Sequence, residues 1–284
     1  MTNGGSPMRT VPLRSGTVEY DDSGGAGPVL VFLTGILVGA TLWRHVVADL
    51  RADHRCVVLE VPLGAHRLPM NPDADLSSRG LAGLVAEFLD ALDLRGVTLI
   101  GCDWGGAQLV AGYGLSSRLA RLVLLPQESF DNFPPGLPGK ALHQSSRIPG
   151  ATFLALQTLR IRGLRRSPMN FGLMSKRPVP ADIMDDWLRP SRTSRPIRRD
   201  LHRYLRTTRA AEYLDAAALL STVDHPALVL WAPESRMMRA ANGARLAEIL
   251  PRGRLVEVPD AFTLIPEDQP TRCAAHLREF VATT

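Results

Sequence analysis

Val97-Thr-Leu-Ile-Gly-Cys-Asp-Trp-Gly-Gly106 is the stretch that decides how this chain folds. It begins as a run of β-forming residues and ends in a Gly-rich turn, and a helical stretch, Ala107 to Tyr113, follows at once. The pattern predicts a strand, a sharp turn and a helix, with Asp103 at the apex of a nucleophile elbow. Glycines two residues either side of Asp103 permit the turn, because a Cβ there would clash. An Asp held in this way can attack carbon and form an ester, or it can transfer protons.

Strands and helices alternate on both sides of this stretch. Residues 76–92, for example, place apolar side chains at a helical period. Such alternation predicts the α/β class, with a mostly parallel sheet covered by helices on both faces. Pro-rich breaks interrupt the middle of the chain, so we expect a core of 1–127 and 218–284 with a helical cap inserted at 128–217. A cap of this kind encloses an apolar substrate and excludes water.

The segment Gly-Cys-Asp-Trp-Gly-Gly at 101–106 resembles the elbow of the α/β-hydrolase superfamily, in the branch of epoxide hydrolases and haloalkane dehalogenases. Four other landmarks follow in the order of that family. They resemble the strand before the oxyanion loop (29–35), the start of the next helix (42–44), the strand that carries the catalytic acid (227–231) and the segment around the catalytic His (256–270). The resemblance covers roughly residues 10–283 and implies the α/β-hydrolase fold.

Three segments depart from the pattern of that branch. Thr34-Gly35-Ile36 stands where His-Gly is usual, Ser235 stands at the position of the acid, and Thr263 stands at the position of the His. Thr cannot act as a general base near neutral pH, and general-base assistance typically contributes a factor of roughly 10²–10⁴. We therefore expect ordinary two-step hydrolysis to fail unless another His reaches the site.

Three of the seven His residues lie in segments that could supply a replacement base. His66 follows a strand predicted at 56–59, in a loop at the carboxyl edge of the sheet, where sites form in this class of fold. His143 and His202 lie in the expected cap. The alternative for each is an ordinary solvated or packing residue.

A second carboxyl group could come from Glu128 or Asp131, which follow a strand predicted at 121–125. The resemblance implies an acid here, because some dehalogenases place their catalytic acid just after this strand. With no His to orient, such an acid would act directly on Asp103 or on substrate. When two carboxyl groups lie close together, the charge of one raises the pKa of the other, so that one can serve as acid and the other as base. The alternative is a helix cap or a surface carboxylate.

The resemblance also implies roles for the neighbours of Asp103. In dehalogenases the Trp at the position of Trp104 donates its indole N–H to the halide, although a packing role fits this residue too. The backbone N–H groups of Trp104 and Ile36 are the expected oxyanion-hole donors. Epoxide hydrolases also need cap tyrosines. Tyr204 and Tyr213 are nine residues apart, and one unbroken helix would point them to opposite faces, so Tyr204 is the candidate.

The composition of the chain limits the location and the binding partners that we expect. The chain has 284 residues, 45% of them hydrophobic, and a net charge of +5. No apolar run approaches the ~20 residues that span a bilayer. Residues 1–7 lack an apolar signal core, and three Cys do not suggest a disulfide framework, so we expect a cytoplasmic location. We expect no cofactor, no metal and no membrane partner, and either a monomer or a homodimer.

Basic residues are most dense between Arg147 and Arg209, and all but two of the 33 basic residues are Arg. We interpret this density as solvated cap helices and not as a nucleic-acid surface, because no nucleic-acid motif accompanies it.

Three functions remain open. The first is an atypical enzyme that acts through Asp103 on a small hydrophobic metabolite, by epoxide opening, cyclisation, elimination or rearrangement. The second is a hydrolase of the epoxide hydrolase or dehalogenase type with a relocated His. The third is a non-catalytic protein that binds a small molecule.

Overall fold

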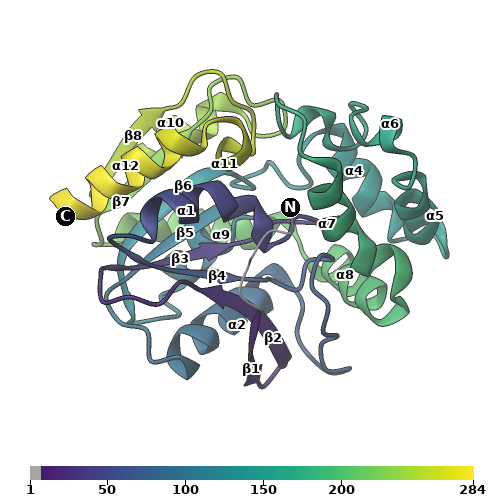
Figure 1. Cartoon of the computed structure of the whole chain (residues 1–284), viewed down its shortest axis with the longest axis horizontal. Coiled ribbons are helices and arrows are strands. Elements are labelled where there is room, and N and C mark those ends of the chain that lie inside the picture. The colour runs from purple at the N-terminus through teal and green to yellow at the C-terminus, as the bar shows by residue number, and fades with distance from the viewer. Residues whose placement is uncertain (1–7) are drawn as a thin grey trace.

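A computed structural model describes residues 8–284, and the expectation about residues 1–7 lies outside this part (Figure 1). One sheet runs through the molecule, with strand order β1-β2-β4-β3-β5-β6-β7-β8. The strands are β1 (Arg9–Leu13), β2 (Gly16–Asp22), β3 (Val29–Leu33), β4 (Arg55–Leu59), β5 (Val97–Asp103), β6 (Leu119–Gln127), β7 (Ala227–Trp231) and β8 (Gly253–Glu257). Pairing is antiparallel from β1 to β4 through β2, and parallel from β4 to β8.

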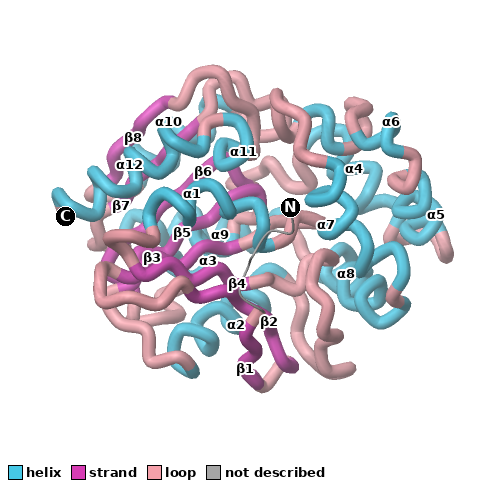
Figure 2. The backbone as a smooth tube through the Cα atoms, in the orientation of Figure 1, coloured by secondary structure: helices cyan, strands magenta, loops and turns pink. Residues whose placement is uncertain are grey.

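Helices cover both faces of the sheet, as Figure 2 shows. The helices of the core are α1 (Arg44–Leu50), α2 (Ser78–Ala91), α3 (Gly106–Gly112), α9 (Ala210–Leu219), α10 (Ala240–Ile249), α11 (Ile265–Asp268) and α12 (Pro270–Thr283), with 3-10 turns η1 (Ala40–Trp43) and η3 (Leu220–Thr222). α1 packs with α11 and α12, whereas α3 packs with α2 and α9. Every residue of β5, near the middle of the sheet, is buried. That burial explains why the strand reads as a continuous apolar run.

Local sequence explains where α2 begins. The Ser77 hydroxyl accepts a hydrogen bond from the backbone N–H of Gly80 at 3.0 Å, which caps the first turn. Leu81, Leu84 and Phe88 then recur on one face and are buried in the core. The predicted amphipathic helix is therefore present, two residues shorter at its N-terminus than the predicted 76–92 span and one residue shorter at its C-terminus.

The inserted segment after β6 is helical. It contains α4 (Gly136–Ser145), α5 (Ala151–Thr158), α6 (Arg162–Arg165), η2 (Phe171–Leu173), α7 (Ala181–Thr193) and α8 (Arg195–Thr207). These helices form a lobe beside the sheet, at the right of Figure 1. α9, which lies mostly inside the expected cap range, packs against α3 of the core instead. Across residues 8–284, the helices are too short or too polar to cross a membrane.

Candidate active site

Asp103 stands at the apex of the predicted elbow, between β5 and α3. Its backbone φ of +66° lies in the left-handed region, which is uncommon for a residue other than Gly. Backbone strain of this kind persists where the surrounding structure imposes it, and it is concentrated at functional sites. Gly35 passes so close that a Cβ built on it would lie 2.3 Å from Asp103 Oδ2. Only Gly at position 35 therefore leaves room for the Asp103 carboxyl group.

A single hydrogen bond compensates the buried Asp103 carboxyl group for the loss of contact with water. Its Oδ2 accepts one hydrogen bond, from the backbone N–H of Ile36 at 3.0 Å. Burial raises the pKa of Asp103 to about 7, and the Ile36 hydrogen bond opposes that rise only in part. Near neutral pH, this group is therefore divided between its protonated and ionised forms.

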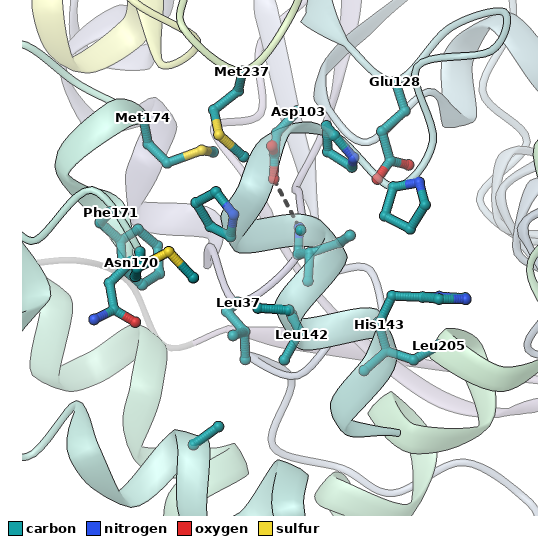
Figure 3. A pocket seen from close by; sticks show the side chains of 18 of the residues that line it. Leu37, Asp103, Glu128, Leu142, His143, Asn170, Phe171, Met174, Leu205 and Met237 are labelled. Carbon is teal, nitrogen blue, oxygen red and sulfur yellow. Dashed lines mark hydrogen bonds between the residues drawn. The ribbon is translucent and has the colours of Figure 1, made fainter. Parts of the chain in front are cut away.

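Glu128 follows β6 directly and lies at the same cavity as Asp103 (Figure 3). Its backbone N–H donates to the Asp103 carbonyl at 3.1 Å, which joins the ends of β5 and β6. Its Oε2 accepts from the Tyr213 hydroxyl at 2.5 Å and the Tyr204 hydroxyl at 3.3 Å. Its Oε1 is buried and has no hydrogen-bond partner among residues 8–284. Burial first, and the charge of Asp103 in addition, raise the pKa of Glu128 to about 8.

The prediction that Tyr204 and Tyr213 point to opposite faces is wrong, because they do not share a helix. α8 ends at Thr207 and α9 begins at Ala210, and the break between them redirects the chain. The two hydroxyl groups lie 3.3 Å apart, and the Tyr213 hydroxyl also lies 2.8 Å from Ser78 Oγ. Both rings are completely buried. The break therefore produces a carboxyl–tyrosine cluster in which Glu128 is the central residue.

The structure places the completely buried Trp104 side chain in the packed core, outside the lining of the cavity. The indole N–H points at Ser78 Oγ, 3.5 Å away, and the backbone N–H donates to the Cys102 carbonyl at 2.8 Å. Of the two expected oxyanion-hole donors, only Ile36 donates a hydrogen bond to Asp103.

A pair of hydroxyl groups occupies the region where the resemblance implied acid and His. Ser235 Oγ and Thr263 Oγ lie 3.1 Å apart, and Ser235 also accepts from the Met238 backbone N–H at 3.2 Å. Neither residue lines the cavity. Thr34 likewise has a structural contact, because its hydroxyl accepts from the Val61 backbone N–H at 2.9 Å.

His66 and Asp131 are not brought to the cavity. The His66 ring is buried, with Nδ1 accepting from the Gly64 backbone N–H at 3.2 Å and Nε2 lying 3.5 Å from Asp200 Oδ2. Asp131 is exposed and forms an ion pair with Arg239 at 3.1 Å. His66 thus belongs to the packing between the core and α8, and Asp131 belongs to the surface.

The cavity has a volume of about 180 Å³ and is mostly apolar. Asp103 and Glu128 are its carboxyl groups, and His143 and Asn170 are its other polar side chains. His143 comes from α4, and burial, with Arg147 as a smaller cause, lowers its pKa. The apolar lining that sequence reasoning missed includes Leu37, Phe133, Leu142, Phe171, Met174 and Met237. Most of these residues come from loops and cap helices, where a single sequence carries no periodic signal for them.

Metal ligation has no support in the site geometry. Within residues 8–284, no three His, Cys, Asp or Glu side chains are grouped as metal ligands.

Comparisons with known proteins agree with this architecture. Residues 28–270 match the family model described as alpha/beta hydrolase fold, so the chain belongs to the α/β-hydrolase family. It is 28% identical over 154 residues to a haloalkane dehalogenase of Mesorhizobium japonicum, which covers 51% of this chain and 48% of that protein. It is 28% identical over 254 residues to a 2-hydroxy-6-oxononadienedioate/2-hydroxy-6-oxononatrienedioate hydrolase of Burkholderia vietnamiensis, covering 84% and 81% of the two chains.

Solved structures confirm the predicted fold. A putative ancestral haloalkane dehalogenase superposes with a TM-score of 0.77 at 20% identity, covering 97% of this chain and 98% of that one. An alpha/beta hydrolase fold protein from Burkholderia ambifaria gives a TM-score of 0.78 at 23% identity, covering 95% and 96%. These likenesses show the α/β-hydrolase fold, and the curated relatives named above are hydrolases.

Proposed function

We propose that this protein is an enzyme in which Asp103 and Glu128 act as a proton-transfer pair on a small hydrophobic metabolite. The observation that carries the proposal is the placement of two buried carboxyl groups at one apolar cavity, with pKa values raised to about 7 and about 8. The charge of Asp103 adds to burial in raising the pKa of Glu128, so once Asp103 is ionised, Glu128 holds its proton more tightly. Two carboxyl groups whose pKa values are pushed apart can divide the roles of base and acid.

The pair supports isomerisation, in which no atom of water enters the product. In an epoxide cyclisation, Asp103 takes the proton of a hydroxyl group of the substrate, whose oxygen attacks the epoxide carbon. The carbon–oxygen bond of the epoxide breaks, and the released oxygen takes the proton of Glu128. The substrate gains and loses one proton, and the pair is reset when a proton returns from Asp103 to Glu128. Elimination and rearrangement use the same two roles.

Tyr204 and Tyr213 would set which oxygen of Glu128 carries the proton. Both hydroxyl groups contact Oε2, which leaves Oε1 to hold the hydrogen. A tyrosine hydroxyl that donates to the carboxylate also steadies Glu128 after it has given up its proton. We therefore assign the two tyrosines to positioning and charge stabilisation, in place of the direct epoxide contact considered for Tyr204.

A hydrolase with a relocated base is the second candidate, and His143 is the observation that favours it. Its ring lines the cavity, and its lowered pKa leaves it neutral and able to accept a proton at pH 7. In that mechanism Asp103 would attack carbon, and His143 would activate the water that releases the ester.

The test is incubation with hydroxy-epoxides, simple epoxides and haloalkanes in ¹⁸O-labelled water, followed by mass analysis of products and of the intact protein. Isomerised product without ¹⁸O, lost in Asp103→Asn and Glu128→Gln but kept in Asp131→Asn, is the expected result. Asp131→Asn is the matched control because that carboxyl group is exposed and remote from the cavity.

Other outcomes would reject the proton-transfer pair. Labelled diol that disappears in His143→Gln would establish the hydrolase with a relocated base. A stable adduct on Asp103 would identify a nucleophile whose ester is not released. Neither product nor adduct with any of these substrates, together with binding of the same compounds, would indicate a non-catalytic pocket.

A further inference from the structure

Large apolar side chains are exposed on one part of the cap. Of the ten such side chains found over residues 8–284, seven lie between positions 137 and 169, with exposed fractions from 41% to 70%. We call them the cap patch: Leu137, Ile148, Phe153, Leu154, Ile161, Leu164 and Met169. They belong to α4, α5, α6 and their connections, which Figure 1 places together at the end of the molecule away from the C-terminus. Clustering of this kind marks an interaction surface, whereas scattered exposed apolar residues do not.

The cap patch lies in a segment that carries positive charge only. Residues 132–181 contain no Asp or Glu and contain eight basic residues, which exceeds the net charge of +5 for the whole chain. Asp185, from α7, pairs with Arg162 and Arg165. Lys140, Arg147, Arg160 and Arg166 are exposed, and none of them forms an ion pair with a described residue. The rest of the chain therefore has a net charge of −3 (5 − 8), and the excess of positive charge lies in this segment.

The cavity opens toward this surface. Three of its lining residues are exposed to solvent, and they are Ala141 on α4, Ala155 on α5 and Met169 of the cap patch itself. The cap patch and the cavity therefore share Met169 and the helices α4 and α5.

We propose that the cap patch docks this protein on the surface of an anionic lipid bilayer. The apolar side chains enter the boundary between headgroups and acyl chains, and the unpaired Arg and Lys side chains contact lipid phosphates. An anionic surface is the charge complement of the segment. A second copy of this chain would place two cationic patches face to face, and a nucleic acid would leave the apolar side chains without a partner. This peripheral mode departs from our expectation of no membrane partner, which rested on spanning segments and a signal core. It does not depend on the proposed chemistry.

The test is flotation of the full chain with vesicles of phosphatidylcholine, alone or mixed with phosphatidylglycerol. We expect binding to the mixed vesicles that weakens with added salt, and little binding to phosphatidylcholine alone. Leu154→Asp with Ile161→Asp, and separately Arg147→Gln with Arg160→Gln, should each lower the partition coefficient at least ~10-fold. These side chains are exposed, so the variants should fold, which a thermal melt would confirm.

Matched controls lie outside the cap. Leu214→Asp, at a side chain of 44% exposure on α9, and Arg51→Gln, on the core, should leave vesicle binding unchanged. The proposal is overturned if the mixed vesicles are not bound, or if the two cap variants bind them as wild type does. Binding to duplex DNA but not to vesicles would make the surface a nucleic-acid site. A dimer in light scattering that Leu154→Asp with Ile161→Asp dissociates, without vesicle binding, would make it an interface between copies.

Discussion

Replacing Asp103 by Asn should change how the stability of the protein depends on pH. The pKa of the Asp103 carboxyl group is about 7 in the folded protein, against an ordinary value of 3.8. Because the folded state holds this proton more tightly, its contribution to stability is complete below about pH 4 and is lost as pH rises through 7. A gap of about three pKa units, at 1.36 kcal/mol per unit, corresponds to about 4 kcal/mol. Asn cannot ionise, so the variant should escape this loss.

The assay is urea unfolding of wild type and Asp103→Asn, followed by Trp fluorescence, from pH 4 to pH 9. The Asn side chain keeps a carbonyl oxygen that can accept from the Ile36 N–H, so the variant and wild type should differ little in free energy of unfolding at low pH. Relative to wild type, the variant should become more stable by up to about 4 kcal/mol between these limits, with the change centred between pH 4 and 7. Burial also raises the pKa of Glu60 to about 7. Because both proteins contain Glu60, its contribution cancels in the difference between them.

The matched control is Asp131, whose pKa is shifted in the opposite direction from that of Asp103. The hydrogen bond and charge of Arg239 lower the pKa of exposed Asp131, so its contribution is present above the ordinary carboxyl pKa and is lost as pH falls. Asp131→Asn should therefore show no relative gain in stability toward pH 9. If the difference between Asp103→Asn and wild type stayed constant from pH 4 to pH 9, the reasoning about burial of Asp103 would be refuted.

Three further predictions concern the site and its support. With a turned-over substrate, kcat/KM should rise with pH as Asp103 ionises near 7 and fall as Glu128 deprotonates near 8. Tyr213→Phe removes a hydrogen bond that lowers the pKa of Glu128, so it should move the upper limb to higher pH, and an unmoved limb would assign it to another group. Gly35→Ala should lower activity by about 100-fold, because the added Cβ displaces the Asp103 carboxyl group, while the protein stays folded. A kinetic assay measures the activity, and a circular dichroism spectrum checks the fold. Asp268→Asn should lower the free energy of unfolding by about 2–4 kcal/mol, since the buried carboxyl group accepts from three backbone N–H groups and one hydroxyl; a loss under about 1 kcal/mol by urea unfolding would contradict it.

Local sequence was sufficient for the elbow and for the order of the elements around it. β5 reads as a strand because it is buried on both faces, and the turn after it needs small residues wherever backbone or side chain comes close. The resemblance predicted an acid just after the next strand and left Glu128 and Asp131 as alternatives, and a residue in that position lies at the carboxyl edge of the sheet. These features depend on neighbours in the chain and on a sheet edge that every parallel strand shares.

The choice among candidates was decided by contacts between distant segments. Glu128 and Asp131 are three residues apart, and yet one is buried beside Tyr204 and Tyr213 while the other reaches Arg239 at the surface. The convergence of the two tyrosines required the break between α8 and α9, and helical periodicity alone gave the opposite result.

Sequence by itself thus determined the α/β class and located Asp103 at the elbow, and the resemblance implied that Thr263 and Ser235 stand at the His and acid positions. The tertiary structure alone decided that those two hydroxyl groups satisfy each other and that Trp104 faces away from the cavity. It also decided that the two carboxyl groups of the cavity have raised pKa values. The physical reason is that secondary structure follows from local periodicity and turn geometry, whereas burial and hydrogen-bond partners depend on which distant segments the packed fold brings together.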